Sequence, residues 1–250
     1  MVLNPMEQFE VKPLIPIHLG GYDISFTNQA LLMCIVVVAS ALFLTLAVSK
    51  RRLVPSRMQS MAEVSYEFVA NMINSASGEE GLKFFPFVFT IFMFVLFSNV
   101  LGMIPWSYTV TSQICVTFAL AALVILTVIV TGFARHGIGF LKLFVPKAPI
   151  YLLVLLVPIE IISFLTRPIS LSVRLFANML AGHTMLAVFA GFVVALGSAG
   201  GILAALSIAP MFLIVAIMLL ELLVAFLQAY VFAILTCIYL SEALHLHDNH

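Results

Sequence analysis

Charged side chains are scarce in this chain. Asp, Glu, Lys and Arg together make up 9% of its 250 residues, whereas a soluble domain carries about 25%. Hydrophobic residues make up 63%, and the mean hydropathy is +1.20. So few charges cannot cover a water-facing surface, and the composition therefore excludes an ordinary soluble domain. It predicts a protein that crosses a membrane several times.

The chain also contains few cysteines and has no net charge. The formal net charge is zero, which gives no indication of a nucleic-acid partner. Cys34, Cys115 and Cys237 are odd in number, far apart and set in apolar runs. We interpret them as small core hydrophobes rather than as a disulfide or metal set. No cofactor and no metal site are expected.

The N-terminus lacks the pattern of a cleavable signal. The first 27 residues contain Glu7, Glu10, Asp23 and three prolines, which a signal peptide would not tolerate. We therefore expect residues 1–29 to form an extramembrane segment, followed by a single transmembrane domain over residues 30–250.

Apolar runs of helical length predict an all-α transmembrane domain. The first three expected spans are residues 30–49, 84–104 and 111–134, each close to the ~20 residues that a helix needs to cross a bilayer. Residues 55–76 are more polar, and Glu63 and Glu67 lie four residues apart among apolar side chains. This segment is typical of an amphipathic helix on the membrane surface.

The two remaining apolar blocks are too long to be simple spans. Residues 150–196 and 202–240 would form helices of roughly 70 and 58 Å, about twice the hydrocarbon thickness. Each block is either two spans, giving seven in total, or one long tilted helix, giving five. Seven spans would place Arg167 and Arg174 in an outer turn, against the positive-inside rule. We therefore expect five spans, the last two (149–196 and 202–242) being long, steeply tilted helices in a hairpin.

Basic residues predict the orientation. The cluster at residues 50–52 and the group Arg135, Lys142 and Lys147 fall on the same side of the expected membrane, while the N-terminal segment has only Lys12. Lys and Arg accumulate on the cytoplasmic side. The N-terminus is thus expected outside, and the C-terminus on the cytoplasmic or matrix side.

A set of polar residues lies at membrane depth in the last two blocks. Residues seven apart in a helix share a face, and the chain has two such series: Glu160, Arg167 and Arg174, extended by Asn178, and then Glu221 and Gln228. His183 lies on roughly the opposite side of the first series. Two antiparallel helices can therefore bring a cation, an acid, an imidazole and two amides to one region.

Arg174 is the most informative member of this set. A guanidinium at the bilayer centre costs roughly 2.5–3.5 kcal/mol on insertion scales, and arginine cannot lose its proton to avoid that cost. Glu160 and Arg167 taken alone are explained by mutual neutralisation, and a lone intramembrane histidine by packing. Arg174 is harder to explain in that way, because intramembrane charges usually mark ion paths.

Three motifs carry a resemblance to a known family. Residues 166–183 (TRPISLSVRLFANMLAGH) resemble the signature of the subunit a family of F-type ATP synthases. Residues 221–232 (ELLVAFLQAYVF) resemble the family's final helix, and residues 97–105 (FSNVLGMIP) are similar to its second-span motif. The resemblance covers nearly the whole chain and is weakest before residue 30.

The resemblance implies a stationary, proton-conducting subunit beside a rotating ring of c subunits, each with one essential carboxylate. Two offset aqueous half-channels would load and unload protons on that ring. By resemblance, Arg174 is the essential arginine between the half-channels, Glu160 lies on the inner side, and Arg167 is a supporting residue. Asn178, His183, Glu221 and Gln228 match positions of the outer half-channel and the ring contact.

The family also implies partners and a location. These are the c-ring, the peripheral-stalk b-type subunits, other ATP synthase subunits and the lipid bilayer, with no nucleic acid. The chain would not be an enzyme by itself. We expect a bacterial inner membrane, with the mitochondrial inner membrane as the alternative. Some family members exchange the acid and the histidine at positions 183 and 221, and an acid–imidazole pair remains in either case.

Two other functions remain open from the sequence. A secondary transporter could use Arg174 as an anion-substrate site, with Pro158, Pro168 and Pro210 as the only sign of broken helices. A non-transporting assembly subunit would need the polar residues only for packing. The C-terminal His245, His247 and His250 could bind a metal, but a solvated tail is expected.

Overall fold

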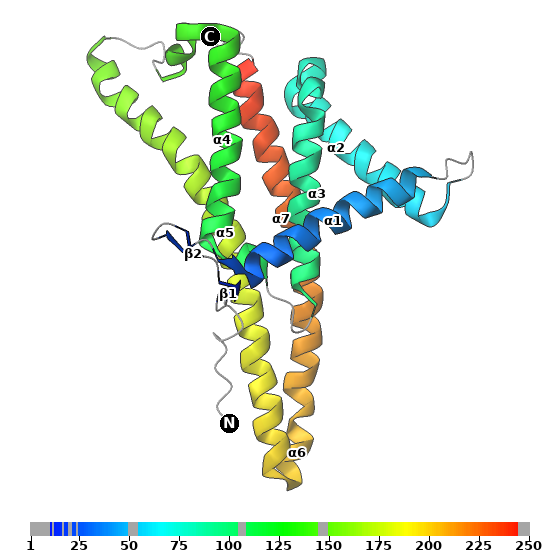
Figure 1. Cartoon of the computed structure of the whole chain (residues 1–250). Coiled ribbons are helices and arrows are strands. Elements are labelled where there is room, and N and C mark those ends of the chain that lie inside the picture. Colours follow the sequence, from blue (N-terminus) through cyan, green and yellow to red (C-terminus); the bar gives the residue numbers. More distant parts are fainter. Residues whose placement is uncertain are drawn as a thin grey trace. The chain divides into compact units, whose positions relative to one another are not determined.

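The computed structural model describes residues 11, 13–16, 18–19, 22–23, 25–49, 55–104, 109–144 and 150–244. Five of its helices are long and apolar enough to cross a membrane, which confirms the all-α polytopic fold expected from the sequence. The helices that carry these spans are α1 (Asn28–Ser49), α3 (Phe85–Gly102), α4 (Ile114–His136), α5 (Ile150–Ala199) and α7 (Ile208–Leu244) (Figure 1).

Shorter elements connect these helices. They are α2 (Arg57–Gly81), η2 (Leu82–Phe84), η3 (Val110–Ser112), η4 (Gly137–Phe144) and α6 (Gly201–Leu206). The segment before α1 contains two small antiparallel pairs that the sequence did not predict. In these, β1 (Pro13–Ile15) pairs with β4 (Phe26–Thr27), and β2 (His18–Leu19) pairs with β3 (Tyr22–Asp23).

The seven-span alternative is wrong, because each long apolar block forms one principal helix. α5 continues for 50 residues through Pro158 and Pro168. A proline removes one backbone donor and bends a helix, but the neighbouring hydrogen bonds can persist. α5 ends at Ala199 and is followed by Gly200, whose φ of 72° suits a residue without a side chain. The 37 residues of α7 then follow α6.

The amphipathic segment forms α2, which begins after an N-cap. The Ser56 side chain accepts a hydrogen bond from the backbone N–H of Gln59, which satisfies one of the free donors at the helix start. The helix is interrupted at Gly78, where φ is 64° and ψ is −164°. α2 thus extends beyond the expected end at residue 76, and its position on the membrane surface stays a prediction.

The chain divides into two compact units, which are described separately. The first contains residues 1–40, 94–113 and 175–228, and the second contains residues 41–93, 114–174 and 229–250. In the first unit, the second half of α5 and the first part of α7 lie side by side, with α6 at the turn between them (Figure 1).

The second unit is held together by contacts from α2, α4 and α5 to neighbouring segments. The Ser77 hydroxyl of α2 donates to the Cys237 carbonyl of α7 at 2.9 Å, and Arg135 of α4 pairs with Glu80 of α2 at 2.6 Å. The hydroxyls of Thr117 and Ser172 lie 3.1 Å apart and join α4 to α5. These interhelical polar contacts supplement apolar packing, as is common in membrane helices.

All three cysteines are free, but only one occupies the expected core position. Cys237 is buried, whereas Cys34 and Cys115 are exposed on the surface of the chain. In a span, exposed apolar side chains face lipid or another subunit, so an apolar run does not distinguish the core face of a helix from its outer face.

Several residues used in the sequence analysis lie outside the described part of the chain. They are Glu7, Glu10, Lys12, the basic cluster at residues 50–52, Lys147, and the C-terminal His245, His247 and His250.

Candidate functional site

The first unit brings four of the expected site residues together in two interhelical pairs. Asn178 Nδ2 of α5 donates to Gln228 Oε1 of α7 at 3.1 Å. One turn further along α5, His183 Nε2 lies 3.5 Å from Glu221 Oε1. The partner number falls on α7 as it rises on α5, so the two helices run antiparallel, as the sequence predicted for this hairpin.

Gly182 allows the Glu221 carboxylate to reach α5. A Cβ atom built on Gly182 would lie 2.6 Å from Glu221 Oε1 and 3.0 Å from its carboxyl carbon. No side chain larger than hydrogen fits there unless the carboxylate moves. Because Glu221 can approach the backbone of α5 at Gly182, it reaches His183, although the spacing of Asn178 and His183 places them on different sides of α5. Glu221 packs over the helix backbone beside the histidine.

Two of these four side chains, Glu221 and Gln228, are deeply buried, whereas His183 is half-buried and Asn178 is exposed. Glu221 is 5% exposed and Gln228 is 3% exposed. Among the described residues, neither carboxylate oxygen of Glu221 has a hydrogen-bond partner within normal limits, and neither does Gln228 Nε2. Leaving such atoms unpaired costs about 1–3 kcal/mol for each group. Buried groups kept at that cost are typical of functional sites rather than of packing.

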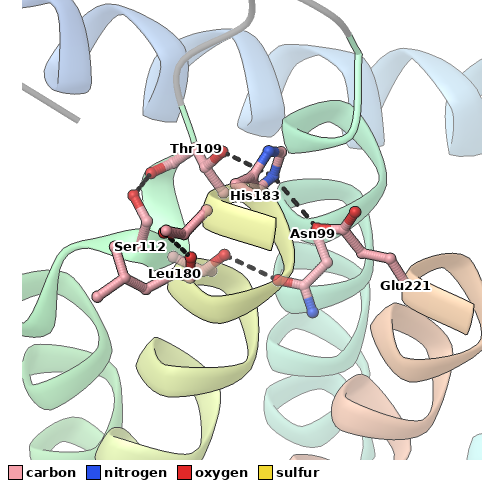
Figure 2. A network of polar contacts seen from close by, with 8 residues as sticks. Asn99, Thr109, Ser112, Leu180, His183 and Glu221 are labelled. Atoms are coloured by element: carbon pink, nitrogen blue, oxygen red, sulfur yellow. Dashed lines mark hydrogen bonds and ion pairs between the residues drawn. The ribbon is translucent and has the colours of Figure 1, made fainter. Parts of the chain in front are cut away.

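A turn between α3 and α4 covers the histidine (Figure 2). Thr109 Oγ1 lies 3.1 Å from His183 Nε2. Next to it, Thr111 Oγ1 donates to Asn99 Oδ1 at 2.9 Å, and Asn99 Nδ2 donates to the Ala225 carbonyl of α7 at 3.3 Å. The turn, α3, α5 and α7 therefore form one buried hydrogen-bonded network inside the first unit.

Arg174 belongs to the second unit, at the point of α5 where that unit ends. Its side chain is exposed on the surface of the chain. Within the described part of the chain, no acidic side chain forms an ion pair with it. A permanent cation at this position is thus available to a group from outside the chain.

Arg167 has a partner that the sequence analysis did not identify. Its guanidinium donates to Glu242 in the last turns of α7. The guanidinium carbon also lies 5.0 Å from the centre of the Tyr239 ring and 5.8 Å from that of Phe164, within cation–π distance. The half-buried Glu160 takes part in none of the ion pairs of the described residues. The expected neutralisation of Arg167 by Glu160 is replaced by pairing with Glu242.

Sequence reasoning missed three residues of these two sites. Thr109 contacts His183, Gly182 contacts Glu221, and Glu242 pairs with Arg167. Glu242 is separated from Arg167 by 75 residues, so no helical spacing could connect them. Thr109 lies just beyond the motif at residues 97–105, and Gly182, inside the motif at residues 166–183, has no side chain that could indicate chemistry. Their roles depend on tertiary contacts.

The chain matches the family model described as ATP synthase A chain over residues 30–241. It is 62% identical to the ATP synthase subunit a of Mesorhizobium japonicum over 244 residues, which covers 97% of each chain. It is also 62% identical to the corresponding protein of Chelativorans sp. over 246 residues, covering 98% of this chain and 99% of that one. With the protein of Agrobacterium fabrum it shares 58% identity over 246 residues, with coverage of 98% and 99%.

A match over most of the chain, together with full-length relatives of this identity, establishes the family and removes the open alternatives of an unrelated transporter or assembly factor. The five spans agree with that assignment. The chain therefore belongs to the ATP synthase A chain family, whose members serve in the proton-translocating membrane sector of ATP synthase.

Proposed function

We propose that this chain is the stationary, proton-conducting subunit of a rotary ATP synthase. It provides two offset aqueous half-channels that open on opposite sides of a membrane and end at a rotating c-ring. Protons enter from the outer side, bind ring carboxylates, and leave on the inner side after the ring has turned. The chain performs no bond-making chemistry on ATP and contributes only the proton path.

The observation that best supports this function is the pair formed by the half-buried His183 and the buried Glu221, in which Nε2 and Oε1 are 3.5 Å apart. An imidazole and a carboxylate at this separation can exchange a proton after a small movement. Both groups can exist with or without the exchanged proton, so the pair can pass a proton from the imidazole to the carboxylate or from the carboxylate to the imidazole. We assign this pair to the outer half-channel, with Asn178 and Gln228 next along the path.

Arg174 is assigned the role of the gate between the half-channels. A guanidinium remains protonated in proteins, so it cannot pass protons itself. A ring carboxylate that approaches it must be deprotonated, because the neutral acid gains nothing from the cation. Protons are thus prevented from passing directly from one half-channel to the other, and each must travel with the ring.

The magnitude of that attraction is limited by the energy available to turn the ring. At 4 Å and an effective dielectric constant of 20, an arginine–carboxylate attraction is about 4 kcal/mol. A membrane potential of roughly 170 mV supplies a similar ~4 kcal/mol per proton. A dry, bidentate pair would be stronger and would stop rotation. The contact between the guanidinium and the ring carboxylate is therefore hydrated or transient.

The inner half-channel is assigned to Glu160, with Arg167 as a supporting residue. On this assignment, the N-terminus lies outside and the C-terminus on the cytoplasmic side of a bacterial inner membrane. The chain contacts the c-ring along α5 and α7 and is held in place by b-type stalk subunits. Membership of the family and the polar residues at membrane depth support these partners.

Arg174→Ala tests the gate in membrane vesicles that contain the assembled complex. The variant should lose ATP synthesis and ATP-driven proton pumping while it retains or gains passive proton leak, because the barrier is removed and the carboxylates remain. Arg135→Ala, which removes an arginine of α4 that pairs with Glu80, is the control and should keep ATP-driven pumping. Undiminished pumping by Arg174→Ala would refute the gate.

A further inference from the structure

The His183 imidazole has two polar neighbours on the same nitrogen. Nε2 lies 3.1 Å from Thr109 Oγ1 and 3.5 Å from Glu221 Oε1. Thr109 is 2% exposed. A buried hydroxyl and a buried carboxylate thus face one ring atom from different segments, the α3–α4 turn and α7 (Figure 2).

Thr109 is held in place from several directions. Its carbonyl accepts a hydrogen bond of 2.6 Å from the Ser112 hydroxyl. The following residues are tied to α3 by the hydrogen bond from Thr111 to Asn99. A Cβ atom built on Gly102 would lie 2.8 Å from Thr109 Cγ2, so the missing side chain of Gly102 lets the end of α3 approach the turn. The oxygen of the Thr109 hydroxyl is therefore fixed relative to the imidazole, while its hydrogen remains free to rotate.

A hydroxyl is suited to this place because it donates one hydrogen bond and accepts others. When the ring is neutral and protonated on Nδ1, the Thr109 O–H can donate to the lone pair of Nε2. When Nε2 carries a proton, the same oxygen can accept a hydrogen bond from that N–H, although it is a weaker acceptor than the Glu221 carboxylate. A side chain that only donates or only accepts could not hold the ring in both states.

We propose that Thr109 is a positioning residue for the proton relay, which keeps Nε2 of His183 directed at Glu221 in both protonation states. This inference rests on the proposed function of the His183–Glu221 pair. In the transfer step, the N–H bond at Nε2 of the imidazolium breaks and an O–H bond forms on Glu221 Oε1. A neutral imidazole and a carboxylic acid result. The Thr109 hydroxyl then rotates to donate to the emptied nitrogen and retains its own proton.

The test compares Thr109→Val, which keeps the branched shape and removes the hydroxyl, with Thr109→Ser, which keeps the hydroxyl. Passive proton conduction is measured in vesicles stripped of the catalytic head and normalised to the amount of assembled complex. T109V should conduct about fivefold more slowly, the factor expected from the loss of one hydrogen bond of ~1 kcal/mol in the transfer step. T109S should remain within about twofold of the unmodified protein.

Thr184→Val is the matched control. Its hydroxyl donates to the Leu180 carbonyl within α5 at 2.6 Å, so its removal leaves the contacts of His183 Nε2 intact. T184V should conduct normally. Normal conduction by T109V would overturn the proposal. Equal impairment of T109S and T109V would also overturn it, because the loss would then arise from packing rather than from the hydroxyl.

A double variant distinguishes positioning from a general structural effect. In the Glu221→Gln background, T109V should slow conduction by less than about twofold, because the transfer that it supports is already lost. A full fivefold further loss would contradict the proposal. If T109V complex does not assemble, Thr109→Ala takes its place. Failure of both to assemble while T109S assembles would assign the hydroxyl to folding and overturn the proposal.

The same series separates this inference from the proposed function. Unchanged conduction by Glu221→Gln alone would remove the relay itself, and with it the outer path proposed above. Slowed conduction by Glu221→Gln together with unchanged conduction by T109V would remove only the role of Thr109.

Discussion

Replacing Gly182 with alanine should disable the proposed relay without weakening the helix. The new Cβ would lie 2.6 Å from Glu221 Oε1, and ordinary van der Waals contact begins at about 3.4 Å. The carboxylate must therefore retreat by about 0.8 Å, away from α5. Since His183 lies on α5 and its Nε2 is already 3.5 Å from that oxygen, the pair would separate beyond the reach of direct proton transfer.

The size of the effect follows from the displacement. A misplacement of about 1 Å at a reacting group can cost ~100-fold in rate, so we expect G182A to slow proton conduction by about ten- to 100-fold. Alanine is a better helix former than glycine by ~1 kcal/mol, so assembly and stability should not fall by a comparable amount. A lower rate at unchanged complex content is therefore the expected signature.

Gly191→Ala provides the matched control. Gly191 lies on the same helix, and a Cβ atom built there meets nothing within 4 Å. Both variants would be compared by passive proton conduction in stripped vesicles and by ATP synthesis in intact ones. Normal conduction by G182A would refute the argument, because the carboxylate would then tolerate the displacement. Equal losses in G182A and G191A would refute it too, since they would point to a general requirement for glycine.

Three further outcomes are expected. Glu221→Gln should slow proton conduction at every outer pH, since the amide cannot accept a proton; unchanged flux across a pH series would count against the relay. Glu242→Gln should slow proton conduction, because it leaves the charge of Arg167 without its partner. The double variant Arg167→Gln/Glu242→Gln should recover most of the lost conduction in the same assay, and a double variant no faster than Glu242→Gln would contradict this charge argument. Asn99→Ala should lower the unfolding free energy of the detergent-solubilised complex by about 1–3 kcal/mol for each of the two partners left unpaired. Ser98→Ala, at a buried hydroxyl with no partner among the described residues, should change it little, and equal losses would contradict the network.

The number of spans could be predicted from the sequence, because the cost of placing charge in lipid restricts where helices cross. The positions of Arg167 and Arg174 were sufficient to choose five spans over seven, and α5 is indeed one helix. The β-pairs before α1 could not be predicted, since strands of two or three residues leave no periodic pattern. The break of α2 at Gly78 depends on the backbone conformation of a single residue.

The candidate site was only partly accessible from the sequence. The heptad spacing of Glu221 and Gln228 correctly placed both residues against α5. It could not show that Glu221 packs over Gly182, because this contact depends on how closely two helices approach. Thr109 was beyond reach for a similar reason, since a turn residue has no periodicity that relates it to a histidine 74 residues later. Residue identity indicates chemistry, whereas the partner of a polar group is decided by packing.

The different surroundings of Glu221 and Arg174 indicate which reaction partners come from outside the chain. Glu221 is 5% exposed and has its proposed proton-exchange partner, His183, within the same unit. Arg174 is exposed and has no acidic partner in the described part of the chain. A guanidinium facing lipid at the bilayer centre would carry a cost of roughly 2.5–3.5 kcal/mol or more, so another surface must cover it. Under the proposed function that surface is the ring, and the carboxylate that Arg174 attracts is therefore a moving one. A fixed carboxylate from the chain itself would neutralise the proposed gate and leave nothing to hold the ring carboxylate ionised, so an Arg174 without an acidic partner among the described residues is what the proposed mechanism requires.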